Sequence, residues 1–228
     1  MDDLTNKTVI VLTRYNENID WLRYIINFVD HIFIYNKGEN ENFFKIFNLN
    51  DNIHKITIQR LPNVGRIDHT LVYFILEHWD NLPEKIVNLP GSVMMCKSKG
   101  YYLSAITKKL KTVKEKYKGF YSPRFHIVSS NYNYTINDYK AEGFCNKNDN
   151  PFIKSEYPDL QTWKKSIIDN IDIKYVAMRG MFVVCRDNIK HIDKSIYENL
   201  RASLSIGDNI ENGHFAERIW AHLFKQFV

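Results

Sequence analysis

The chain has 228 residues, of which 44% are hydrophobic, 14% aromatic and 25% charged, with a formal net charge of +5. This composition excludes extended disorder and predicts one folded domain over residues 1–228. No stretch approaches about 18 consecutive apolar residues, and no basic start precedes an apolar run, so we expect neither a transmembrane segment nor a secretory signal. The three cysteines are widely spaced, which predicts no disulfide framework or zinc cluster and fits a soluble cytoplasmic protein.

The first 60 residues alternate between strand and helix patterns. Residues 7–13 are a continuous apolar, β-branched run, typical of a strand buried on both faces. Apolar residues then recur at helical spacing over 19–29, and further strand patterns span 32–35 and 55–60. This order predicts an α/β fold, in which an open, mainly parallel central sheet is flanked by helices.

The remaining chain continues the alternation, with one interruption. Residues 119–162 are polar and aromatic and contain three prolines, which predicts a long loop region with short elements, typical of a functional flap. The other expected elements are a helix over 71–79, a strand over 84–89, an amphipathic helix over 97–118, a strand-like run over 175–185, and helices over 189–204 and 215–227.

Polar residues follow each of the first three predicted strands. Ligands of parallel α/β sheets bind beyond the carboxyl ends of the strands, where loop amides and helix N-termini converge. Each strand end offers a cation with an amide or an acid, which suits an anionic, hydroxyl-rich ligand such as a sugar nucleotide. The alternative is that these are ordinary turn residues and solvated charges. The residues concerned are Arg14, Asn16, Glu17, Asn36, Lys37, Gly38, Asn63, Gly65, Arg66, Asp68 and His69.

Several well-known motifs are absent from the sequence. There is no GxGxxG and no GxxxxGK[ST], which disfavours a dinucleotide-binding Rossmann protein and a P-loop enzyme. There is also no GxSxG and no HExxH, the motifs of α/β-hydrolases and zinc metalloproteases.

Six stretches carry a resemblance to a known family, and they occur at 14–21, 34–38, 61–70, 79–83, 179–186 and 213–220. In this order they resemble successive blocks of a domain family long described as of unknown function and regarded as akin to the GT-A glycosyltransferases. The resemblance covers nearly the whole chain, from residue 8 to residue 224. It implies a GT-A-like (Rossmann-like) fold and transfer of a sugar from a nucleotide-sugar donor to a hydroxyl of a glycan or protein acceptor.

The resemblance also implies roles for particular residues. Residues 13–17 are similar to the first nucleotide-contacting loop of these transferases, and 36–38 stand where many have an acidic turn. GT-A enzymes commonly hold Mn²⁺ or Mg²⁺ on an Asp-x-Asp motif, which this chain lacks. The metal requirement is therefore open, and Arg14, Arg66 and Lys37 are expected to contact the phosphates and neutralise the leaving diphosphate.

Inverting glycosyl transfer needs a carboxylate that takes a proton from the acceptor hydroxyl. Glu217 begins a late helix, where many relatives in the wider superfamily place an acceptor-side acid. The alternative is a glutamate that stabilises the helix dipole. Asp68 and His69 are further catalytic candidates, with a first-turn acid and a structural histidine as the alternatives.

The segment 97–118 holds eight lysines and one glutamate, a local charge of +7. Such a helix could bind nucleic acid through counterion release. Arginine and aromatic residues are sparse on its outer face, so we favour a solvated amphipathic helix and expect no nucleic-acid partner. A third alternative is a catalytically inactive GT-A-like binding module.

Overall fold

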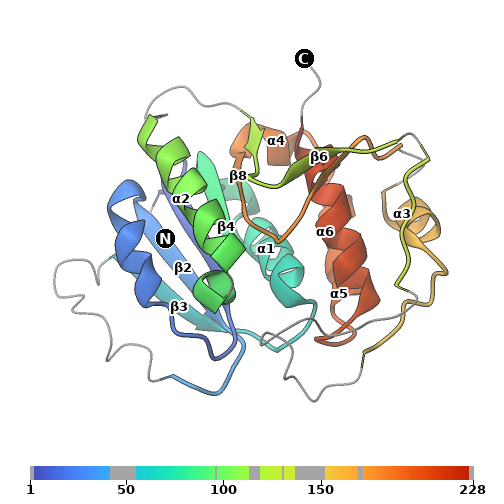
Figure 1. Cartoon of the computed structure of the whole chain (residues 1–228), viewed down its shortest axis with the longest axis horizontal. Coiled ribbons are helices and arrows are strands. Elements are labelled where there is room, and N and C mark those ends of the chain that lie inside the picture. Colours follow the sequence, from blue (N-terminus) through green and yellow to red (C-terminus); the bar gives the residue numbers. More distant parts are fainter. Residues whose placement is uncertain are drawn as a thin grey trace.

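The computed structural model describes residues 3–41, 55–95, 97–112, 119–129, 131–136, 152–168 and 172–225. A six-stranded sheet in the order β3-β2-β1-β4-β8-β5 organises these ranges (Figure 1). Four neighbouring strands are parallel: β1 (Thr8–Arg14), β2 (His31–Asn36), β3 (Ile56–Arg60) and β4 (Lys85–Pro90). β8 (Phe182–Cys185) is antiparallel to β4, and β5 (Phe120–Tyr121) is antiparallel to β8. The predicted α/β fold with a mainly parallel central sheet is confirmed.

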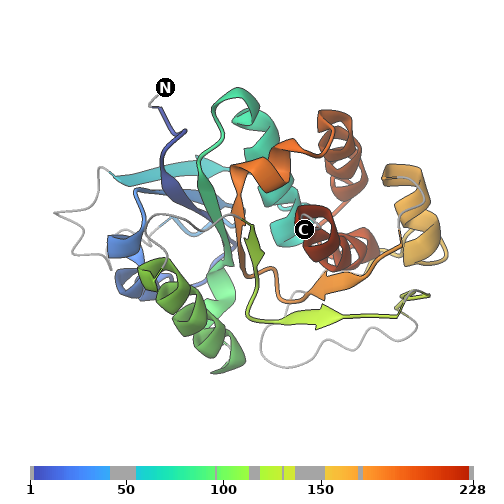
Figure 2. The ribbon, with the colours of Figure 1, turned by 90° about the horizontal axis from the view of Figure 1, so that it is seen from above.

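Helices cover both faces of the sheet (Figure 2). One face carries the short 3-10 helices η1 (Asp20–Tyr24) and η2 (Ile26–Phe28), together with α2 (Lys97–Thr112). The opposite face carries α1 (Arg66–Glu77), α3 (Leu160–Ile167), α4 (Arg186–Lys190), α5 (Lys194–Leu204) and α6 (Glu211–Phe224). Two further 3-10 helices, η5 (Trp79–Asn81) and η6 (Gly91–Met95), flank β4. β6 (Phe125–Ile127) and β7 (Tyr175–Ala177) pair in a small second sheet, and β7 contacts α6.

The central strand explains why the chain folds in this way. Val9 and Val11 of β1 pack into the core beneath α1, whereas Ile10 and Leu12 pack into the core beneath α2, and all four are fully buried. Burying a side chain of this size stabilises the fold by about 1.5–3 kcal/mol. The apolar run that predicted this strand therefore contributes side chains to the cores on both faces of the sheet.

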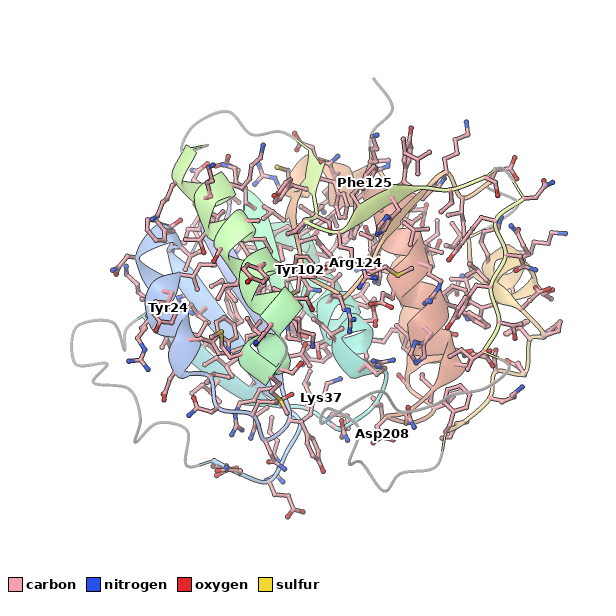
Figure 3. The ribbon with its side chains drawn as sticks, in the orientation of Figure 1. Tyr24, Lys37, Tyr102, Arg124, Phe125 and Asp208 are labelled. Carbon is pink, nitrogen blue, oxygen red and sulfur yellow. The ribbon has the colours of Figure 1, made fainter. Side chains whose placement is uncertain are left out.

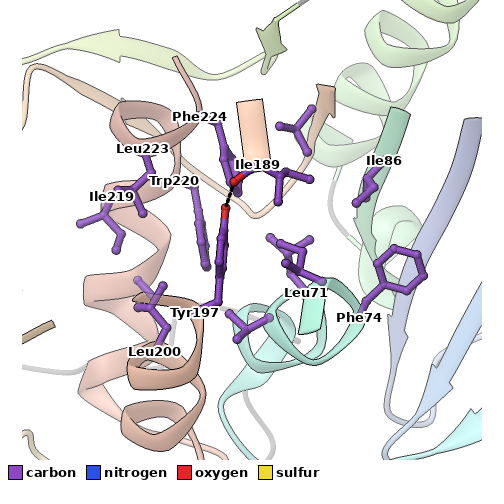
Figure 4. Packing of buried hydrophobic residues seen from close by; sticks show 14 of the residues in the cluster. Leu71, Phe74, Ile86, Ile189, Tyr197, Leu200, Ile219, Trp220, Leu223 and Phe224 are labelled. Atoms are coloured by element: carbon purple, nitrogen blue, oxygen red, sulfur yellow. Dashed lines mark hydrogen bonds between the residues drawn. The ribbon is translucent and has the colours of Figure 1, made fainter. Parts of the chain in front are cut away.

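The larger core lies between the sheet and the carboxyl-terminal helices (Figure 4). Trp220 and Phe224 of α6 stack with ring centroids 5.3 Å apart. The hydroxyl of Tyr197 is buried with them and donates a hydrogen bond to the carbonyl oxygen of Ile189 over 3.1 Å. This packing fixes α5 and α6 beside α1, so the amino-terminal halves of α1 and α6 are held in a defined relative position.

Several predicted elements differ in detail. The helix expected over 19–29 consists of the two short 3-10 helices η1 and η2. The helix expected over 189–204 is α4 and α5, because Asp193 caps α5 by accepting a hydrogen bond from the amide of Ser195 over 2.8 Å. The expected helix over 71–79 begins earlier, at Arg66, and the one over 215–227 begins at Glu211. Residues 113–118, at the end of the predicted lysine-rich helix, lie outside the described residues.

The sheet order identifies the edge at which sheets of this kind commonly bind ligands. The chain moves outward from β1 to β2 and β3 and then returns to the other side of β1 as β4, so the order reverses between β1 and β4. Such a reversal opens a crevice at the carboxyl ends of the strands. Arg14, Asn36 and Arg60 pair across β1, β2 and β3 at this edge. None of the described helices is both long and apolar enough to cross a bilayer.

Candidate functional site

Arg14 lies at the carboxyl end of β1 and is 1% exposed. Its guanidinium donates hydrogen bonds to the side-chain oxygen of Asn36 over 2.8 Å, to the carbonyl of Asn40 over 2.7 Å and to the carbonyl of Glu17 over 2.8 Å. Burial lowers the pKa of this guanidinium below its ordinary value. These contacts bind the loop after β1 to the loop after β2, so the geometry gives Arg14 a positioning role.

Lys37, which directly follows β2, also holds neighbouring segments together through hydrogen bonds. Its Nζ donates hydrogen bonds to the carbonyl oxygens of Val64 and Arg66, both over 2.5 Å. Burial lowers the pKa of Lys37 to about 7, while the charges of Asp68 and Asp208 act in the opposite direction. Lys37 and Asp208 lie at the same edge of the molecule (Figure 3). The side chain therefore ties β2 to the loop that precedes α1.

The remaining predicted residues of the first two loops also meet. The side-chain oxygen of Asn16 accepts a hydrogen bond from the amide of Asn40 over 3.1 Å. Glu17 accepts one from the amide of Tyr15 over 2.6 Å, and its carboxylate lies against Gly91 after β4, where an added Cβ would come within 2.8 Å. The loops after β1, β2 and β4 thus form one continuous rim.

Gly38 allows the loops after β1 and β2 to pack closely against each other. An added Cβ at Gly38 would lie 1.9 Å from the carbonyl oxygen of Tyr15, a distance that only movement of the backbone could relieve. We expect Gly38→Ala to lower the free energy of unfolding by about 1–3 kcal/mol, measured by urea unfolding. Gly100→Ala, within α2, is the matched control: an added Cβ there would lie 4.0 Å from Sδ of Met94, so this change should raise stability by about 0.5–1 kcal/mol. An unchanged stability of Gly38→Ala would contradict the close packing of the two loops.

The loop before α1 forms the next part of the rim. Gly65 adopts a left-handed φ of 57° and donates its amide hydrogen bond to the carbonyl of Gly207 over 2.6 Å. Asn63 donates to a carboxylate oxygen of Asp208 over 3.1 Å. This loop is thereby held against the segment that leads into α6. Arg66, the first residue of α1, is exposed and reaches α6, with its Nη1 2.6 Å from Nε2 of His214.

Two carboxylates face the same region from α1 and α6. Asp68 is buried and accepts a hydrogen bond from the indole nitrogen of Trp220 over 2.7 Å. Burial, and next the negative charge of Glu217, raise the pKa of Asp68 from 3.8 to about 7. The side chain of Glu217 is 22% exposed and remains accessible to a ligand. A carboxyl group whose pKa is raised to near neutrality, close to a second and more exposed carboxylate, is an arrangement that acid–base chemistry uses.

Glu217 is itself oriented by neighbouring donors. One of its oxygens accepts a hydrogen bond from the backbone amide of Arg179 over 2.6 Å, and the other lies 3.6 Å from the guanidinium of Arg218. By contrast, Glu211, also in the first half of α6, is buried and accepts hydrogen bonds from the amides of Ile136 and Ser155. Glu211 therefore links α6 to preceding segments, whereas Glu217, which lies within α6 rather than at its start as predicted, contacts Arg179 and Arg218.

The histidines of the site are held neutral. Burial, followed by the charges of Arg66 and Arg218, lowers the pKa of His214 to about 3. Burial, followed by the charges of Lys37 and Arg201, lowers the pKa of His69 to about 4. His69 is only 5% exposed, and its Nδ1 has no hydrogen-bond partner among the described residues. The catalytic role predicted for His69 stays a prediction, and its burial favours a structural one.

Taken together, the predicted residues at the strand ends form a chain of contacts from Arg14 through Lys37 to Arg66 and onward to α6. Comparison with known proteins adds no relative. No protein-family model, curated protein or solved structure matches this chain. The GT-A resemblance and the roles it implies therefore remain predictions, and the physical arrangement of the rim is the basis for a function.

Sequence reasoning missed the residues that complete the site from the carboxyl-terminal half, namely Arg179, His214, Arg218 and Trp220. The strand-like run over 175–185 is interrupted at Gly180, where the chain leaves β7 of the small sheet and enters β8 of the large one. The Arg179–Gly180 pair within an apolar run was the available signal for a turn. Without a topology, nothing indicated that this turn lies against α1 and α6.

The described residues do not assemble a metal-binding cluster. Within 3–41, 55–95 and the other described ranges, no three His, Cys, Asp or Glu side chains converge to hold an ion. Glu39 and Glu41 have the spacing of an acidic pair, but both are exposed, and Glu41 lies 3.5 Å from Arg60. The described residues therefore do not supply a donor set that fits the divalent metal that GT-A enzymes commonly use.

Two other features lie away from the rim. A cavity of about 260 Å³ opens near the amino ends of β2 and β3, where His31, Phe33 and His78 contribute to its lining. On α2, Lys109 and Lys111 lie over the rings of Tyr121 and Phe28, at 5.4 Å and 4.8 Å from the ring centroids. These two lysines thus contact the protein's own surface, and the solvated-helix interpretation of α2 stays a prediction.

Proposed function

We propose that the protein is a glycosyltransferase that moves a sugar from a nucleotide-sugar donor to a hydroxyl of a glycan or protein acceptor. The observation that carries the proposal is the electrostatic interaction between Asp68 and Glu217, two carboxylates on α1 and α6, near the exposed Arg66. A carboxylate pair supplies proton transfer, and arginine supplies positive charge for departing phosphates. α/β sheets commonly bind nucleotides at the carboxyl edge where the strand order reverses, and the rim lies at this edge.

The proposed step is an inverting displacement. The acceptor oxygen forms a bond to the anomeric carbon of the sugar as the bond from that carbon to the diphosphate oxygen breaks. The electron pair leaves with the diphosphate, and the hydroxyl proton passes to the carboxylate of Glu217. Positive charge beside the diphosphate stabilises the negative charge that develops there.

Asp68 supports Glu217 in this scheme. With a pKa near 7, Asp68 retains its proton over much of the range below neutrality. A neutral Asp68 avoids repulsion between two adjacent carboxylates. Trp220 fixes the orientation of Asp68 through its indole hydrogen bond. Asp68 is thus a positioning residue, and Glu217 is the proposed base.

Arg66 is the proposed phosphate ligand among the cations of the first three loops. Its guanidinium is exposed and contacts a neutral histidine, so its charge is not cancelled by this partner. Arg14 and Lys37, in contrast, donate to backbone carbonyl oxygens and maintain the shape of the rim. Arginine can bind two phosphate oxygens at once, which suits the diphosphate of a donor.

A panel of nucleotide diphosphates and nucleotide sugars tests the proposal, with thermal shift and product release as readouts and with Mn²⁺ or Mg²⁺ present or absent. We expect one nucleotide class to raise Tm, and its sugar conjugate to release sugar faster than in buffer alone. Binding without turnover, even with varied acceptors, would support the inactive binding module instead. The absence of both binding and turnover across the panel would contradict the proposal.

A further inference from the structure

Two arginines of the described chain adopt a backbone conformation that favours glycine. Arg66 has a φ of 54° and Arg179 a φ of 76°, and no other non-glycine residue of the described ranges has a positive φ. This region is unfavourable for a residue with a Cβ. Residues held in such conformations cluster at functional sites, where the rest of the structure maintains them.

The two arginines belong to the same site although 113 positions separate them in sequence. Arg66 reaches His214 of α6, and the amide of Arg179 donates to Glu217, one turn further along the same helix. The neighbours of the two arginines are in contact, since a Cβ added to Gly180 would lie 3.0 Å from Cγ2 of Ile67. Arg66 and Arg179 therefore contact the same part of α6, one from α1 at His214 and the other from the turn between β7 and β8 at Glu217.

The side chain of Arg179 is available for a ligand. Residue Arg179 is exposed, and its guanidinium makes no ion pair with any residue that the structure describes. Its backbone already orients Glu217, a task that any residue other than proline could perform. Glycine would do so with less backbone strain. An arginine at this position is therefore explained by its side chain rather than by the turn.

We infer that Arg66 and Arg179 together bind the diphosphate of the donor, with Arg179 as a ligand-binding residue from the β7–β8 turn. The inference rests on the proposed function for the identity of the donor. Because Arg66 contacts His214 and the backbone of Arg179 contacts Glu217, a diphosphate bound by both guanidinium groups would lie near the base that receives the acceptor proton. Adjacent phosphates offer the paired oxygens that two planar guanidinium groups bind, so the ligand class is a nucleoside diphosphate or its sugar ester.

Arg179→Gly separates the side chain from the backbone. Glycine keeps the amide that donates to Glu217 and relieves the left-handed strain, so the variant should have an unchanged or higher Tm. We expect the Kd for the nucleoside diphosphate that wild type binds, taken from uridine, guanosine and adenosine diphosphates, to increase at least tenfold by isothermal titration calorimetry. Arg179→Lys keeps the charge but loses the paired geometry and should lie between wild type and Arg179→Gly. Arg23→Ala, an exposed arginine of η1, is the control and should bind as wild type does.

The same titrations with inorganic pyrophosphate distinguish failure of the inference from failure of the proposed function. If wild type binds a nucleoside diphosphate and Arg179→Gly binds it equally well, the inference is wrong while the proposed function stands. If wild type binds pyrophosphate in an Arg179-dependent way but binds no nucleotide, the anion site stands and the proposed function fails. If wild type binds neither, both fail.

Discussion

Replacing Glu217 with glutamine is expected to lower kcat by about 10²–10⁴-fold, because an amide cannot take the acceptor proton. Glutamine retains a side-chain oxygen that can accept the hydrogen bond from the Arg179 amide, so the fold around the site should persist. Initial rates should be measured with the nucleotide sugar that the ligand panel identifies. KM for the donor should change little, since Glu217 acts on the acceptor side.

Glu198→Gln is the matched control for this variant. Glu198 is exposed on α5, and its substitution removes the same charge without touching the rim. It should retain the wild-type kcat. If Glu217→Gln turned over as fast as Glu198→Gln, Glu217 would not be the base, whatever the protein binds.

The second large effect concerns stability and pH. Because the folded state raises the pKa of Asp68 from 3.8 to about 7, the folded protein holds this proton more tightly than the unfolded chain does. The contribution of Asp68 to the free energy of unfolding should therefore be complete below the unfolded pKa and fall as pH rises toward 7, by about 1.4 kcal/mol per pH unit. The amide introduced by Asp68→Asn stays neutral and can still accept the Trp220 hydrogen bond, so this fall should disappear in the variant.

Urea unfolding of wild type and Asp68→Asn from pH 5 to pH 7 provides the measurement. Between pH 5 and pH 7 the variant should gain about 2–3 kcal/mol of stability relative to wild type. His69 and His214 contribute to both profiles, because their lowered pKa values destabilise the fold as pH falls below about 6.5, the ordinary histidine value. The difference between the two profiles isolates Asp68. Parallel profiles would show that Asp68 is ionised in the folded protein and would remove its proposed role.

The strands of the sheet were predictable from sequence because burial on both faces leaves a simple pattern. The apolar runs over 7–13, 32–35 and 84–89 correspond to β1, β2 and β4 within two residues at either end. The helices were less predictable. The apolar spacing over 19–29 predicted a single helix, but this segment forms the two 3-10 helices η1 and η2. All of the apolar positions that suggested that helix are buried. The pattern therefore predicted burial correctly but predicted the wrong type of helix.

Half of the candidate site followed from one geometric rule. The carboxyl ends of parallel strands meet at one edge, and Arg14, Asn36, Lys37 and Arg66 are linked there by hydrogen bonds. The rule says nothing about how exposed each cation is, and tertiary packing buries Arg14 and Lys37 against carbonyl oxygens. The other half depends on contacts between distant segments, such as the amide of Arg179 with Glu217, which no local pattern encodes.

Hydrogen exchange measured with and without a saturating nucleoside diphosphate tests most directly whether the rim is where a donor binds. The account predicts protection of the loops at 14–18, 36–41, 61–69 and 178–181 and of the first turns of α6, with little change on α2 or around the cavity near the amino ends of β2 and β3. Protection confined to that cavity, or to the lysines of α2, would place the ligand away from Glu217 and contradict the account.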